Sequence, residues 1–89
     1  MNFPNMININ NKNTLDKIKI NQEVIIKNIY YNSSSMIRLM EMGIIPGEKV
    51  KIVQIAPLGD PIEILIMGYK LCIRKSDAAN IEVEYATNS

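Results

Sequence analysis

The side chains that most often do chemistry in proteins are almost missing from this sequence. It contains no histidine, which removes the commonest general base and the commonest transition-metal ligand. The single cysteine, Cys72, can form neither an internal disulfide nor a multi-cysteine metal site. No nucleophile–base pair and no G-x-x-x-x-G-K-(S/T) phosphate loop is present. We therefore expect no catalytic residue, no cofactor and no enzyme activity.

Carboxylates are the remaining candidates for metal binding. Divalent transition metals favour histidine and carboxylate ligands at close spacing. The acidic side chains after residue 50 instead occupy separated or alternating positions: Asp60, Glu63, Asp77, Glu82 and Glu84. This pattern predicts no tight metal site.

Length and composition indicate one small globular domain with little electrostatic bias. The sequence has 89 residues, is 47% hydrophobic and 21% charged, and carries a formal net charge of +1. That charge gives little attraction to nucleic acid or anionic lipid. No apolar run approaches the ~20 residues of a membrane-spanning helix. The first residues lack the basic and apolar segments of a signal peptide. We therefore expect a cytoplasmic protein.

The elements that would position any functional side chain are short. Residues 1–13, rich in asparagine, are predicted to be a flexible tail, residues 14–86 a single domain and residues 87–89 a C-terminal tail. The apolar alternation within 23–30 and within 48–56 changes phase midway. Such a change of phase indicates a strand that is bent by a bulge.

The remaining elements complete a small barrel. Periodicity and turn residues predict further strands at 62–67, 69–74 and 81–85, a helix at 35–43 and a helical turn at 75–79. Bent strands in a short domain are what a closed barrel requires. The sequence therefore predicts an all-β fold, a five-stranded SH3-like barrel with a short helix after the first strand and a helical turn before the last.

The predicted helix at 35–43 carries the first candidate binding residues. The preceding serines offer an N-cap, and Gly43 offers a C′ residue. Met36, Leu39 and Met40 share one face, but Met40 and Met42 cannot both point the same way as Met36. These methionines either plug one end of the barrel or, where exposed, bind a partner together with Arg38 and Glu41.

Two further segments are candidates. The PLGDP loop at 57–61 either only sets the turn or displays side chains on a stiff support. The outward face of the third strand carries an apolar pair, which the helix or the tail covers, or which serves weak self-association or docking. Together with the helix, these segments give the candidate partner-binding residues Arg38, Met40, Glu41, Met42, Leu58, Asp60, Leu65 and Met67.

The fourth strand and its end have simpler interpretations. Cys72 is expected to be a small, semi-buried strand residue, with a redox role as the alternative. Arg74 and Lys75 form the only adjacent basic pair. They are expected to be a solvated strand end whose charges pair with nearby acidic residues, Glu82, Glu84 or Asp77.

Three stretches carry a resemblance to a known family. They read RLMEMGIIPGEKV at 38–50, IAPLGDPIEI at 55–64 and GYKLCIRKSDAANIEVE at 68–84. The first is similar to the leucine-rich helix and G-x-x-P-G turn of the FeoA family, ferrous-iron transport accessory proteins. The second resembles the family's A-P-L-G-D-P loop and the third its G-Y-x-L-x-L-R-K segment with a final strand. The pieces occur in the family's order and spacing.

The resemblance implies both a fold and a role. It implies an SH3-like barrel that works in the cytoplasm, without catalysis, as an accessory or regulatory protein of bacterial ferrous-iron uptake. The implied partner is a membrane ferrous-iron permease of the FeoB type, bound at its cytosolic GTP-binding portion. Two positions depart from the family pattern. Asn21 replaces a usual glycine and still tolerates left-handed geometry, and Cys72 stands where a small residue is usual.

Two other classes of protein stay open. The same barrel occurs as the C-terminal domain of iron-dependent transcriptional repressors, so the chain could be a detached relative of that domain. A small RNA-binding barrel would need aromatic residues among lysines and arginines. Tyr30, Tyr31 and Tyr69 are few for that purpose, and the net charge is low.

Overall fold

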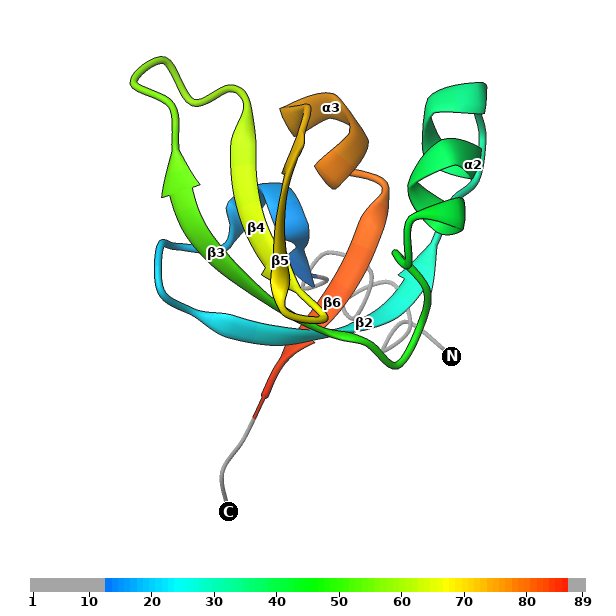
Figure 1. The fold of residues 1–89 in the computed structure, drawn as a ribbon, viewed down its shortest axis with the longest axis horizontal. Coiled ribbons are helices and arrows are strands. Elements are labelled where there is room, and N and C mark those ends of the chain that lie inside the picture. Colours follow the sequence, from blue (N-terminus) through cyan, green and yellow to red (C-terminus); the bar gives the residue numbers. More distant parts are fainter. Residues whose placement is uncertain (1–12, 87–89) are drawn as a thin grey trace, which may run out of the picture.

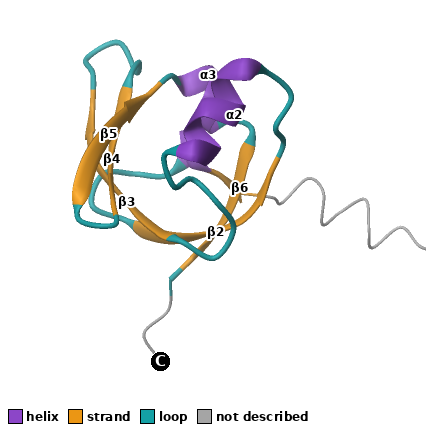
Figure 2. Cartoon of the chain, turned by 45° about the vertical axis from the view of Figure 1, so that its right-hand side comes forward, coloured by secondary structure: helices purple, strands orange, loops and turns teal. Residues whose placement is uncertain are grey.

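The computed structural model describes residues 13–86, which form an antiparallel sheet that curls around one core (Figure 1). The strands neighbour one another in the order β1-β6-β2-β3-β4-β5. Helices α2 and α3 lie next to each other on one side of the barrel (Figure 2). In chain order the elements are β1 (Asn13–Thr14), the 3₁₀ turn η1 (Leu15–Lys17), β2 (Glu23–Ile29), α2 (Ser34–Glu41), β3 (Lys49–Ile55), β4 (Ile62–Ile66), β5 (Tyr69–Ile73), α3 (Lys75–Ala78) and β6 (Ile81–Tyr85).

The prediction of five strands was wrong by one, because β1 was missed. Asn13, assigned to the tail, pairs with Val83, and Thr14 pairs with Glu82. A strand of two residues is too short to show an alternation, so only the tertiary pairing reveals it. Residues 1–12 and 87–89 of the predicted tails lie outside the described residues. The other five strands and both helical segments lie within two residues of their predicted ends.

Both predicted bulges are confirmed. The register between β2 and β6 shifts between Ile26 and Asn28. The register between β3 and β4 shifts between Ile52 and Gln54. An extra residue on one strand bends it and increases its twist, which lets a short sheet close on itself.

The core is aliphatic and draws on every strand from β2 to β6. In β4 the side chains alternate between buried and half-buried, with Ile62, Ile64 and Ile66 pointing inward. Of the helix residues, Met36 and Leu39 are buried, as the prediction that they plug the barrel requires. The buried hydrophobic residues are Leu15, Ile18, Val24, Ile26, Met36, Leu39, Ile44, Val50, Ile52, Ile62, Ile64, Ile66, Ile73, Ala78, Ile81 and Val83.

Helix α2 is capped at both ends as its sequence predicts. The Ser33 hydroxyl accepts a hydrogen bond from the Met36 amide at 3.2 Å. At the other end, the Gly43 amide donates to the Met40 carbonyl and the Ile44 amide to the Leu39 carbonyl, both at 3.0 Å. This Schellman pattern places Gly43 in the left-handed region, at φ +105°. Eight residues alone do not make a stable helix, so these caps and the buried face hold α2 in place.

A two-residue turn joins β4 to β5. Met67 and Gly68 both have positive φ, 50° and 83°, as a type I′ hairpin turn requires. Met67 was predicted to end the third strand and instead occupies the turn, so its strand assignment was wrong. The hairpin imposes this geometry because its twist matches that of the flanking strands. Asn21 has φ 72°, which confirms the left-handed geometry expected there.

Candidate protein-binding surface

A side-chain hydrogen bond joins each end of helix α2 to the segment formed by β5 and the residue that follows it. At the start of α2, Arg74 Nη2 donates to Ser35 Oγ at 3.1 Å. At its end, the Tyr69 hydroxyl donates to the Met42 carbonyl oxygen. Because Tyr69 begins β5 and Arg74 follows it, α2 and β5 run antiparallel. These two hydrogen bonds fix the position of the helix relative to β5, the strand at the end of the sheet.

The C-terminal end of α2 and the β4–β5 turn are in intimate contact. A Cβ built on Gly43 would overlap the Met67 Cε methyl group, and it would lie 3.6 Å from the Tyr69 hydroxyl oxygen. Gly43 is thus favoured by its positive φ, and a side chain at this position would also have to displace the Met67 methyl group. The methyl group of Met67 packs where another residue would place its side chain, which fixes the turn against the helix.

Three of these contacting residues remain exposed on their outer side. The relative exposures are 39% for Met42, 54% for Met67 and 39% for Tyr69. We call Met42, Met67 and Tyr69 the hairpin patch. Methionine is flexible and polarizable, so it adapts to a partner surface, while tyrosine offers an aromatic face and a polar tip. Both elements that carry the patch are held rigidly, which lowers the entropy lost on binding.

A polar cluster occupies the opposite end of α2. Ser35 Oγ donates to Asp77 Oδ2 at 2.7 Å, and Arg74 Nε lies 3.6 Å from the same carboxylate oxygen. Among residues 13–86, Asp77 is the acidic residue that is buried. The prediction that Arg74 pairs with a nearby acid is confirmed, with Asp77 as the partner. Burial of a carboxylate is tolerated here because it has a charged and a hydroxyl partner.

The 57–61 loop lies beyond this polar cluster. Asp60 Oδ1 accepts a hydrogen bond from the Lys75 amide at 2.9 Å, at the first residue of α3. The Gly59 amide donates to the Ala56 carbonyl at 2.7 Å and closes the turn. Asp60 therefore anchors the loop, whereas the Leu58 side chain is 95% exposed. The β3–β4 loop and the Met67 turn lie at opposite ends of β4, so Leu58 and the hairpin patch belong to different surfaces.

The other predicted binding residues are distributed around α2 and the sheet. Met40 is 38% exposed and, two positions from Met42, points to nearly the opposite side of the helix. At least one of these methionines was expected to stay exposed, and both do. Arg38 and Glu41 are exposed on the solvent side of α2. Of the eight candidates, Met42 and Met67 lie where α2 meets the β4–β5 turn, and Leu65 shares a hollow with Met67.

Leu65 faces outward as predicted but is only half-buried. Its register neighbours are Lys51 on β3 and Lys70 on β5, whose aliphatic stems can cover it. A shallow hollow of about 280 Å³ adjoins it, lined by Glu23, Glu48, Lys49, Val50, Lys51, Leu65, Met67 and Gly68. Through Met67, this hollow is continuous with the hairpin patch.

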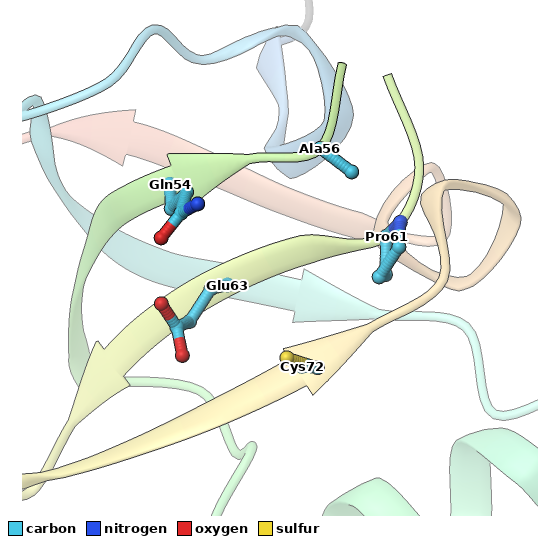
Figure 3. Close-up of a pocket in the computed structure, with 5 residues that line it drawn as sticks. All are labelled: Gln54, Ala56, Pro61, Glu63 and Cys72. Atoms are coloured by element: carbon cyan, nitrogen blue, oxygen red, sulfur yellow. The ribbon is translucent and has the colours of Figure 1, made fainter. Parts of the chain in front are cut away.

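Cys72 is exposed, so the expectation of a semi-buried residue was wrong. Its side chain points outward from the edge strand, where only β4 lies beside it. Figure 3 shows it next to Glu63 in a second hollow of about 220 Å³, which Gln54, Ala56 and Pro61 complete. No group of three or more His, Cys, Asp or Glu side chains that would suit a metal ion occurs among residues 13–86.

Sequence reasoning missed Tyr69, the residue that ties β5 to α2 and forms part of the hairpin patch. It also missed two exposed residues, Ile37 in the middle of α2 and Ile45 after its C-terminal end. The alternation of 69–73 places Tyr69 on the same face as Leu71 and Ile73, which suggests a core residue. Only the position of Tyr69 at the start of the strand, beside a glycine turn, could have indicated that its ring reaches the end of α2 instead of the core.

Comparison with known proteins identifies the family. The model of the FeoA domain matches residues 13–85. The chain belongs to the FeoA family. A solution structure of a FeoA-like protein from Clostridium acetobutylicum superposes with a TM-score of 0.78 and 35% identity, over 88% of this chain and 91% of that one. The resemblance noted in the sequence is thereby confirmed, and with it a place in a family of ferrous-iron transport.

A second relative is part of a much larger protein. The chain is 44% identical over 52 residues to the Fe(2+) transport protein A/Fe(2+) transporter FeoB fusion protein of Porphyromonas gingivalis. That match covers 58% of this chain and 6% of the fusion protein's length. In that organism, therefore, a FeoA-like segment and a FeoB transporter are parts of one polypeptide.

More distant structures show the fold alone. Zinc-bound FeoA from Stenotrophomonas maltophilia, described as a prokaryotic SH3 domain protein, superposes with a TM-score of 0.71 at 24% identity, over 81% of this chain and 89% of that one. The predicted SH3-like fold is thus confirmed. The repressor IdeR of T. acidophilum matches at 22% identity and a TM-score of 0.75, over 85% of this chain and 35% of its own. Within residues 13–86, none of the helices has the length and apolar character to cross a bilayer.

Proposed function

We propose that this FeoA protein is a non-catalytic accessory module that binds the cytosolic GTP-binding portion of an FeoB-type permease. The observation that carries the proposal is the hairpin patch, an exposed apolar surface on two elements locked together by Gly43 and Met67. An exposed apolar surface lowers the solubility of a protein, and a partner that covers this surface removes the disadvantage.

The identity of the partner is supported by the fusion relative. Joining a FeoA segment to a FeoB transporter raises the concentration of each near the other, which favours a working contact between them. The chemistry of this chain agrees with a binding role, because its exposed surface offers apolar contact and few groups for catalysis. Ferrous iron is then the cargo of the permease, and the accessory module acts in the cytoplasm.

A titration of the isolated cytosolic domain of the same organism's FeoB with this protein, followed by calorimetry, tests the proposal. Met67→Asp should weaken binding by about tenfold or more, as for a residue near the centre of an interface. Aspartate tolerates the left-handed conformation of position 67, so the turn is kept. The matched control is Leu58→Asp, an exposed apolar residue on a different surface.

The outcomes separate the alternatives clearly. Absence of binding by the unaltered protein at tens of micromolar would refute the partner. A loss caused by Leu58→Asp but not by Met67→Asp would move the docking site to the 57–61 loop. The alternative of a detached repressor domain rests only on shared fold with IdeR. That alternative requires this chain to bind a DNA-binding protein. The same calorimetric titration, with such a protein in place of the FeoB domain, would detect the association.

A further inference from the structure

We propose that Met67 is an oxidation site, and that its conversion to the sulfoxide by a peroxide releases the C-terminal end of α2 from the β4–β5 turn. Among the methionines of residues 13–86, Met67 has the most exposed side chain, at 54%, whereas Met36 is fully buried. Met40 and Met42 are also exposed, but less so, at 38% and 39%. Susceptibility of methionine to oxidation depends on access of the oxidant to sulfur.

The reaction needs only the thioether and a peroxide. A lone pair of Met67 Sδ attacks one peroxide oxygen, the O–O bond breaks and an S–O bond forms. When the oxidant is hydrogen peroxide, its second oxygen takes up a proton and leaves as water. Sulfur thus loses two electrons and the peroxide gains them. The product is a polar, chiral sulfoxide in place of a flexible apolar side chain, and sulfoxide reductases reverse it.

The position of Met67 turns this common reaction into a structural event. Its Sδ and the Tyr69 hydroxyl oxygen each lie 3.6 Å from the point where a Gly43 Cβ would stand. Oxidation therefore adds a polar oxygen beside the contact that joins Gly43, Met67 and Tyr69. The apolar contact between the methyl group and Gly43 is exchanged for a dipole that prefers water or a hydrogen-bond donor.

A donor lies close by, namely the Tyr69 hydroxyl. In the reduced protein it donates to the Met42 carbonyl oxygen and so holds the end of α2. A sulfoxide oxygen is a stronger acceptor than a thioether, so it competes for this hydrogen. Oxidation at one atom thus removes both attachments of the helix end to the hairpin, the methyl contact and the hydrogen bond. Disruption of the patch would also weaken docking, a consequence that rests on the proposed function.

The test uses the whole chain without a partner. The protein is treated with hydrogen peroxide, the oxidised methionines are located by peptide mass spectrometry, and amide hydrogen exchange is followed at Gly43 and Ile44. These amides make the C-terminal bonds of α2. Exchange at both should accelerate about tenfold after oxidation, as for a local opening that has become easier. Met67→Leu should abolish the acceleration, Met40→Leu should not, and a methionine sulfoxide reductase should reverse it.

Two results would overturn the inference. One is oxidation of Met40 or Met42 while Met67 stays intact. The other is an oxidised Met67 with unchanged exchange at Gly43 and Ile44. Titration of the oxidised and reduced protein with the FeoB cytosolic domain is a separate measurement. If the reduced protein fails to bind while the exchange response persists, the proposed function fails and the oxidation site stands.

Discussion

Ser35 at the start of α2 and Asp77 in α3 are joined by a 2.7 Å hydrogen bond, although 42 residues separate them. Arg74 approaches both, through Nη2 to the serine and Nε to the carboxylate. This cluster ties the two helices together at the end of the barrel away from the hairpin patch. The placement of α2 therefore depends on a polar contact at one end and an apolar contact at the other.

Replacement of Ser35 should show how much the polar end contributes. Ser35→Ala leaves the buried Asp77 carboxylate without its hydroxyl donor, which should lower the free energy of unfolding by about 1–2 kcal/mol. Urea denaturation measures the change. Ser34→Ala, at an exposed position of the same helical turn, is the control and should be close to neutral. Equal effects of the two variants would mean that the Ser35–Asp77 bond adds nothing.

Gly43→Ala should destabilise the protein more than Gly47→Ala. Both glycines have φ near +100°, at 105° and 97°, so alanine is strained at either by about 1 kcal/mol. A Cβ at position 47 meets no atom within 4 Å, whereas one at 43 meets the Met67 methyl. The Met67 methyl is the end of a flexible, exposed side chain and can turn aside, so displacing it should add only about 0.5–1 kcal/mol at position 43.

A double variant isolates that contact. In a Met67→Ala background the methyl group is gone, so Gly43→Ala should cost no more than Gly47→Ala. Urea denaturation of the set gives the coupling between positions 43 and 67 directly. If the two glycine variants are equally destabilised in the original background, the contact between Gly43 and Met67 is not tight.

Asp60 distinguishes an anchored loop from a displayed one. Asp60→Ala removes the acceptor for the Lys75 amide and should cost about 1 kcal/mol, as for loss of a helix cap. Asp60→Asn keeps an oxygen acceptor and should lose less. Thermal denaturation compares the two. If both variants keep full stability but lose affinity for the FeoB domain, Asp60 contacts the partner instead.

The thiol of Cys72 should react as an exposed group. A thiol reagent should label the folded protein at a rate close to that of the unfolded chain, because the side chain is exposed on the edge strand. Cys72→Ser should change stability by no more than about 0.5 kcal/mol. Protection of the thiol in the folded protein would show that another segment covers the edge of β5.

Local patterns predicted the features that depend on neighbouring residues. The phase changes in β2 and β3 revealed the bulges, and Ser33 and Gly43 revealed the ends of α2. Each of these signals lies within a few residues of the feature that it predicts. The barrel could therefore be derived from alternation and turn chemistry together with the family resemblance.

The binding surface could not be derived in the same way. The Tyr69–Met42 bond and the Gly43–Met67 contact join residues 24–27 positions apart, and no local pattern encodes such pairs. Met67 followed the alternation of β4 and was assigned to the strand, although the hairpin needs it in the turn. Leu65 was correctly placed outside, but its position between Lys51 and Lys70 depends on the register of three strands.

The short pairing of β1 with β6 bears on how such a module can be linked to other polypeptides. Asn13 and Val83 are paired, so the first and last strands of the barrel lie side by side. The β4–β5 turn belongs to the other edge of the sheet, separated by β2 and β3 from the pair formed by β1 and β6. A barrel with this strand arrangement is suited to covalent fusion with another protein, as in the fusion protein of Porphyromonas gingivalis.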